Sequence, residues 1–107
     1  MQILVEMFFN SGAEKRNKGL YQDSIVDFLQ ALNINPNHIA SLHQISYSFS
    51  HLKKYDDALK YLTKVIELTP DWYAFMGRAA IKKAIGDLSG EQEDINQAWA
   101  IGKDCCF

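Results

Sequence analysis

The sequence contains few of the residues that mark a disulfide-stabilised or nucleic-acid-binding protein. Only two of its 107 residues are cysteines, and they stand side by side as Cys105 and Cys106. Adjacent cysteines rarely pair with each other, so no internal disulfide framework is expected, and the tail is interpreted as frayed, with two free thiols. The formal net charge of −2 gives no general attraction to phosphate backbones, which argues against a nucleic-acid partner.

Long hydrophobic runs are also absent. No stretch approaches the roughly 18 to 20 apolar residues that a membrane-spanning helix needs. The apolar run at the N-terminus lacks a preceding positive region and is interrupted by Glu6, so it does not resemble a secretory signal. The sequence therefore predicts a soluble, cytoplasmic protein without a membrane partner. Its apolar fraction of 48% can supply the core of one small domain.

Proline is equally scarce, and its two positions mark a repeat. Pro36 and Pro70 lie 34 residues apart, and the residues before them superimpose without a gap. The matched pairs are Tyr21 with Tyr55, Ser24 with Ala58, Ile25 with Leu59, Phe28 with Leu62, and Ala31 with Val65. A period of this length, with a small residue, a large apolar residue four positions later and a closing proline, is typical of helical hairpins that stack into a solenoid.

The rest of the chain follows a helical pattern. Apolar residues recur at spacings of three and four, and proline and glycine fall between the periodic stretches. Asn37 and Asp71, directly after the prolines, are predicted to cap the third and fifth helices, and Gly102 to end the sixth. No β alternation competes, so the fold class is all-α. The predicted helices cover residues 3–17, 22–34, 37–52, 55–68, 71–85 and 88–101.

These features resemble three tandem tetratricopeptide repeats. The most specific match is the second helix of the middle unit, residues 55–70, in which Ala58 is the small contact and Leu62 the large one. The first unit matches through Phe8, Gly12, Gly19, Tyr21, Phe28, Ala31 and Pro36. The resemblance implies one domain, a right-handed superhelical array of three antiparallel helix-turn-helix hairpins. The repeats would cover approximately residues 5–38, 39–71 and 72–104.

The third unit departs from the family pattern. Glu91 occupies the usual small position, the phase slips by one residue, and no proline closes the unit. Because a terminal repeat has no following neighbour, its outer face must be polar. The sixth helix is therefore expected to cap the array, with a polar face made of Glu91, Gln92, Glu93, Asp94, Asn96, Gln97 and Lys103.

The resemblance also implies a binding surface, because in this family the first helix of each repeat lines a concave groove. His43, Tyr47 and His51 are spaced four apart and so share one helix face. Aromatic, imidazole and basic groups around small residues suit an extended or helical peptide with some negative charge. The main groove positions carried onto this sequence are Phe9, Ala13, Arg16, His43, Tyr47, His51, Tyr73, Met76 and Lys83. The wider set adds Glu6, Asn17, Ala40, Ser50, Ala80 and Ala84.

Sharper site chemistries are not supported. Some family members hold a peptide C-terminus with Lys, Asn and Arg side chains, but the matching positions here hold Phe9, Ala13, Gln44, Tyr73 and either Gly77 or Arg78. His43 and His51 would lie about 12 Å apart along a helix, too far to chelate one zinc ion. A glycine-rich phosphate loop and a nucleophile motif are both missing. No enzyme activity, metal or cofactor is therefore expected.

The predicted function is a non-catalytic module that binds a protein or peptide partner whose identity the sequence does not indicate. Two alternatives stay open: a homo-oligomerisation element, and a regulatory segment of a larger protein. The first rests on the N-terminal stretch, which is more apolar than one core-facing stripe requires and could associate with a second copy. Its apolar residues are Ile3, Leu4, Val5, Met7, Phe8 and Phe9.

Overall fold

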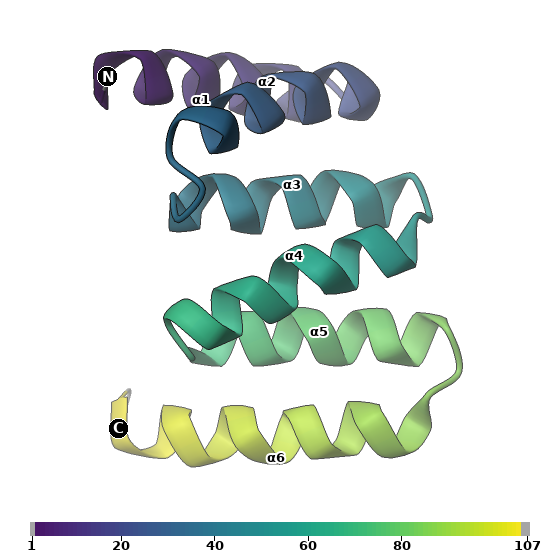
Figure 1. Cartoon of the computed structure of the whole chain (residues 1–107). Helices are drawn as coiled ribbons and strands as arrows, with labels where there is room; N and C mark the ends of the chain where they lie inside the picture. The colour runs from purple at the N-terminus through teal and green to yellow at the C-terminus, as the bar shows by residue number, and fades with distance from the viewer. Residues whose placement is uncertain (1, 106–107) are drawn as a thin grey trace.

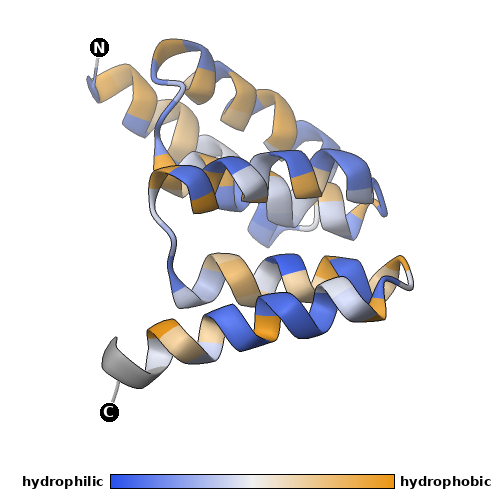
Figure 2. Ribbon diagram, turned by 60° about the horizontal axis from the view of Figure 1, so that its bottom comes forward, coloured by the Kyte–Doolittle hydropathy of each residue, from blue (hydrophilic) through white to orange (hydrophobic). Residues whose placement is uncertain are grey.

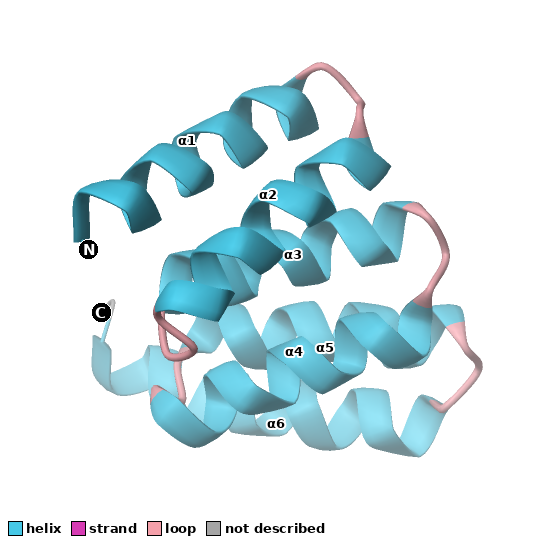
Figure 3. Ribbon diagram, turned by 45° about the horizontal axis from the view of Figure 1, so that its top comes forward, coloured by secondary structure: helices cyan, strands magenta, loops and turns pink. Residues whose placement is uncertain are grey.

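The computed structural model of the protein describes residues 2–105, without the side chains of residues 103–105. Every regular element in this part of the chain is an α-helix (Figure 3), which confirms the all-α fold class. Of these helices, none is both long enough and apolar enough to cross a bilayer. The thiols of Cys105 and Cys106 lie outside the described side chains, so their interpretation stays a prediction. The helices are α1 Gln2–Asn17, α2 Tyr21–Ile34, α3 Ile39–His51, α4 Tyr55–Leu68, α5 Trp72–Ala84 and α6 Leu88–Cys105.

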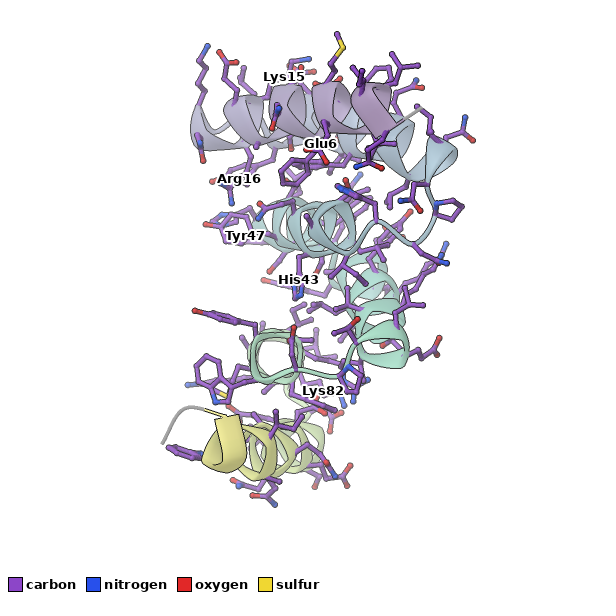
Figure 4. All side chains as sticks on the ribbon, turned by 90° about the vertical axis from the view of Figure 1, so that its left-hand side faces the viewer. Glu6, Lys15, Arg16, His43, Tyr47 and Lys82 are labelled. Atoms are coloured by element: carbon purple, nitrogen blue, oxygen red, sulfur yellow. The ribbon has the colours of Figure 1, made fainter. Side chains whose placement is uncertain are left out.

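The helices form three hairpins that stack in chain order (Figure 1). Within the hairpins α1 packs on α2, α3 on α4, and α5 on α6, while α2·α3 and α4·α5 contacts join successive hairpins. Coloured by hydropathy, much of α6 consists of polar residues (Figure 2). Because neighbouring helices are antiparallel, α1, α3 and α5 run in the same direction, with α2 and α4 to one side of them (Figure 4).

All three hairpins turn in the same way. Gly19, Lys53 and Gly86 have positive φ angles of 80°, 60° and 86°. The next residue in each turn donates its backbone N–H five residues back, as in Leu20 to Lys15 at 2.9 Å. This is the Schellman helix end, which glycine adopts without steric cost and lysine does not. The third hairpin thus keeps the turn geometry of the other two although it has no closing proline.

Two helix boundaries differ by more than one residue from the sequence prediction. Asp71 does cap α5, because its Oδ1 accepts from the Ala74 backbone N–H at 2.7 Å. The predicted cap at Asn37 is wrong: α3 begins at Ile39, and the Asn37 N–H instead donates to the Asn35 side chain at 3.1 Å. That local turn competes with helix formation after Pro36.

The prediction that Gly102 ends the sixth helix is also wrong, because α6 continues to Cys105. A Cβ atom on Gly102 would lie 2.9 Å from Cδ1 of Trp72. Glycine here lets α6 pack closely on the start of α5, so its role is a close contact rather than helix termination. A glycine near a helix end has the same appearance in sequence in both roles.

The core lies between the helices of successive hairpins. Its largest buried side chains include Phe28, Leu42, Ile45 and Val65. A buried hydroxyl pair, Ser24 with Ser48 at 2.8 Å, joins α2 to α3 inside this core. The repeat residues Ala58, Leu62, Phe28 and Ala31 are all buried, as is Phe75 of α5, whereas Ile95 of α6 is half-exposed.

The polar face expected on α6 requires one correction, at Asp94, and the side chain of Lys103 lies outside the described residues. This carboxylate is 2% exposed and faces α5, where it accepts from Arg78 Nη2 at 2.8 Å and Nε at 3.0 Å and pairs with Lys82 at 3.1 Å. The small residue at the α5–α6 contact is the buried Gly90, rather than Glu91. Burial alone would raise the pKa of Asp94, but the hydrogen bonds and positive charges of Arg78 and Lys82 outweigh burial and lower it.

Candidate functional site

An open cleft lies between α3 and α5 on the inner side of the array. Helix α1 packs against α3, whereas α5 is set apart from α3, and His43 points into the space between them (Figure 4). The cleft has a volume of about 300 Å³, and a second hollow of about 370 Å³ adjoins it and adds Ala40, Gln44 and Asp71. The cleft is lined by His43, Ser46, Tyr47, Ser50, Leu62, Tyr73, Gly77, Ala80 and Ile81.

The walls of the cleft carry small side chains, and its floor is apolar. Leu62 of α4 and Ile81 of α5 form the apolar part. At Gly77, a Cβ atom would lie 3.3 Å from Leu62 Cδ1, so glycine leaves room above the floor. The rim carries the larger rings of Tyr47 and Tyr73, which are 48% and 75% exposed. An apolar floor with aromatic rims is the usual form of a pocket that takes one apolar side chain.

Beside the cleft, four side chains from three helices lie in contact in a row. The Arg16 guanidinium of α1 lies 5.2 Å from the Tyr47 ring centroid. The Tyr47 ring lies 4.4 Å from the His51 ring, which stacks on Tyr21 of α2 at 4.5 Å and an interplanar angle of 9°. The stack joins the first hairpin to α3 and fixes the Tyr47 ring from the side opposite α5.

The predicted groove residues are only partly brought together. His43, Tyr47 and Tyr73 line the cleft, and Arg16 and His51 adjoin it through Tyr47. Those five form what we call the groove cluster.

The remaining predicted residues lie elsewhere on the inner side. Phe9 is half-buried, with its ring 5.9 Å from Phe28 and 5.6 Å from His38. Ala13 and Met76 are half-buried, Lys83 is exposed, and none of the three lines the cleft. The sequence analysis named Gly77 only as a position without a clamp side chain, although its place one turn after Tyr73 could have indicated that it lines the cleft.

The carboxylates on the inner side already have partners. Asp71 caps α5 through Oδ1, and its Oδ2 lies 4.0 Å from His43 Nε2. Glu6 accepts from Gln2 at 2.9 Å. Among the described side chains, the buried polar atoms left without a partner are Arg16 Nε and Gln44 Oε1. Both belong to the inner side, where a bound chain could reach the residues that carry them.

Comparison with known proteins identifies the family. The tetratricopeptide repeat model matches residues 5–38 and 39–71. The chain belongs to the tetratricopeptide repeat family. It is 34% identical to human tetratricopeptide repeat protein 6 over 82 residues. The matched region covers 76% of this chain but only 16% of the human protein. The chain therefore spans less than a fifth of the length of this relative.

Solved structures of low sequence identity share the fold. The second TPR of Spaghetti (RPAP3), bound to the HSP90 peptide SRMEEVD, superimposes with a TM-score of 0.85 at 17% identity, over 91% of each chain. A chain of the CopN–Scc3 complex gives a TM-score of 0.89 at 17% identity, over 92% of this chain and 59% of that one. The expected superhelical array of hairpins is thereby confirmed. That residues 72–104 form a third repeat is our proposal, supported by the shared turn at Gly86.

Proposed function

We propose that this tetratricopeptide repeat chain is a non-catalytic interaction module that binds a peptide segment of a partner protein along α1, α3 and α5. The observation that carries the proposal is the cleft between α3 and α5, with Tyr47 and Tyr73 exposed at its rim. Exposed aromatic rings over a concave, partly apolar surface are typical anchors of protein interfaces.

The relatives support the same class of function. One structural neighbour holds a peptide, and another is part of a two-protein complex. The proposal involves no cofactor, metal or reaction, because the groove cluster supplies aromatic contact and hydrogen bonding rather than an activated nucleophile. A scaffold role in the cytoplasm belongs to the same proposal. The alternative of a regulatory segment within a longer protein is supported by the greater length of the human relative.

We expect Tyr73→Ala to weaken binding of a selected peptide by on the order of 1 kcal/mol or more, as the loss of an aromatic anchor usually does. Tyr73 is 75% exposed, so the variant should keep its thermal stability. Fluorescence polarisation with a labelled peptide, selected on the parent protein, measures the change. Lys60→Ala on the outer helix α4 is the control and should bind as the parent does. Equal losses in the two variants would contradict groove binding.

Self-association through α1 is a second candidate function. The observation that favours it is the exposure of apolar side chains on this helix. Ile3 and Met7 are 76% and 61% exposed and lie one helical turn apart, and adjoining exposed apolar side chains favour an interface. The double variant Leu4→Glu, Met7→Glu should dissociate any dimer, as light scattering over a dilution series would show. The matched control, Gln22→Glu with Asn33→Glu on exposed positions of α2, should leave it intact. A parent protein that is monomeric at high micromolar concentration would rule this candidate out.

A further inference from the structure

We infer that the groove selects a peptide segment in which a large apolar side chain lies within two residues of an aspartate or glutamate. The apolar side chain enters the cleft between α3 and α5, and the carboxylate binds Arg16 where it stacks on Tyr47 (Figure 4). This inference rests on the proposed function and specifies which partner segments the groove accepts.

The apolar half of the preference follows from the cleft itself. Its volume of about 300 Å³ is bounded by small side chains such as Ser46, Gly77 and Ala80, so nothing from the chain fills it. Leu62 and Ile81 give it an apolar floor. A polar side chain placed there would lose its water without gaining enough hydrogen bonds, whereas an apolar one would gain by leaving water.

The anionic half follows from the state of Arg16. Among the described residues its guanidinium makes one hydrogen bond, to Asn17 Oδ1 at 2.7 Å, and it has no carboxylate partner. The neighbouring Lys15 differs, because it pairs with Asp27 at 2.9 Å. Both residues lie in the last turn of α1, where the helix dipole favours a positive charge. Arg16, however, reaches across to the ring of Tyr47 in the next hairpin.

That contact prepares Arg16 to bind an anion. A guanidinium lying on an aromatic ring keeps its donors in a fixed plane, and a carboxylate can accept two of them at once. The ring also replaces part of the water around the cation. A partner carboxylate would therefore meet a positive charge that is already held in place and not neutralised by another side chain.

The side chains with opposite charges lie at opposite ends of the groove. The inner carboxylates Glu6 and Asp71 lie at the starts of α1 and α5, whereas Arg16 and Lys83 lie at the ends of the same two helices. Because α1, α3 and α5 run in parallel, the groove changes from acidic to basic along its length. Among these side chains, the positive charge that a partner carboxylate can reach from the cleft is that of Arg16, at the helix ends.

The short spacing of the two partner side chains follows from Tyr47, which belongs to both sites. Its ring lines the cleft and also lies 5.2 Å beneath the Arg16 guanidinium. An extended chain advances roughly 3.3 to 3.6 Å per residue. A spacing of one or two residues therefore matches the 5.2 Å between the Tyr47 ring and the cation.

The experiment selects short random peptides, displayed on phage, against the whole immobilised chain. We expect the enriched peptides to share a large apolar residue within two positions of aspartate or glutamate. Arg16→Gln should weaken their binding roughly tenfold, the usual loss for a hydrogen-bonded charge, and high salt should weaken it as well. The matched control is Lys60→Gln, since Lys60 also lies over a ring, Tyr61 at 5.6 Å, but on the outer helix α4.

Two further variants separate failure of this inference from failure of the proposed function. Ala80→Phe fills the cleft from an exposed position and should abolish binding, while Ala100→Phe on α6 should not. Peptides without an acidic residue, or an Arg16→Gln variant that binds as the parent does, would overturn the inference if Ala80→Phe still blocks binding. No enrichment over the bare support, or full binding by Ala80→Phe, would overturn both. If Arg16→Glu binds the same peptide with lysine in place of its acid, direct pairing is established.

Discussion

Phe28→Ala is expected to lower the free energy of unfolding by about 3 to 5 kcal/mol, the usual loss for a buried phenylalanine. The ring is 0% exposed and lies in the same core cluster as Leu42 and Ile45 of α3. A Cβ atom on Gly12 would come within 2.7 Å of it, so α1 rests directly on this ring. Removing it would leave a cavity where the first hairpin meets the second.

Urea denaturation followed by circular dichroism measures this loss. Small domains are stable by only about 5 to 15 kcal/mol, and in a repeat array each hairpin depends on its neighbour, so we expect α1 and α2 to unfold first. Val26→Ala is the control on the same helix, because Val26 is 51% exposed and should change stability little. Similar midpoints for the two variants would contradict the assignment of Phe28 to the centre of the core.

Most of the fold could be predicted because the signals that define it are local. The 34-residue period places Ser24 and Ala58 at equivalent buried positions. The spacing of apolar residues indicates helices, and Gly19 and Gly86 have the positive φ angles that hairpin turns require. Each of these signals depends on a few neighbouring residues, so it can be interpreted without knowing the packing.

The errors at helix ends arose where packing or a competing turn decides the outcome. Asn37 has a good capping side chain, but its backbone N–H lies in a local turn with the Asn35 side chain, and α3 begins only at Ile39. Gly102 is a residue type that often ends a helix, but here Trp72 lies against it and α6 continues. Neither partner is evident from the local sequence pattern.

The candidate site could be predicted only in outline. The family register places His43, Tyr47 and Tyr73 on the inner side, where they line the cleft. The cleft itself depends on how far α5 stands from α3, which no short motif determines. The stacking of His51 on Tyr21 joins residues 30 positions apart, and a single sequence does not reveal that contact.

Asp94 is a buried residue within a stretch of polar sequence. The acidic stretch of α6 suggests a solvated face, yet Gly90, Asp94 and Ala98 are all buried at a spacing of four residues. Arg78 and Lys82 have the same spacing on α5 and face this stripe. The signal was therefore present in the sequence as two stripes of opposite character, one small and acidic, the other basic.

Asp94→Asn is expected to lower the free energy of unfolding by roughly 3 kcal/mol. Removing one partner of a buried ion pair usually costs about 3 to 5 kcal/mol, because the remaining charge is left without compensation. Arg78 and Lys82 keep 19% and 20% of their side-chain surface in water, so the lower end of this range applies. Glu93→Gln removes the same charge from an exposed neighbouring position and should change stability by a few tenths of a kcal/mol at most.

The same substitution should also change how stability depends on pH. The pKa of Asp94 is lower in the folded chain than in the unfolded one, so the unfolded state binds more protons as the pH falls. The stabilisation from this group is therefore complete above about pH 4 and is lost as the pH falls further, through the lowered folded pKa. Because other carboxylates titrate in the same range, the test is the difference in unfolding free energy between parent and Asp94→Asn, which should narrow in acid. A constant difference from neutral pH to strongly acidic pH would show that Asp94 is not ionised in the folded chain.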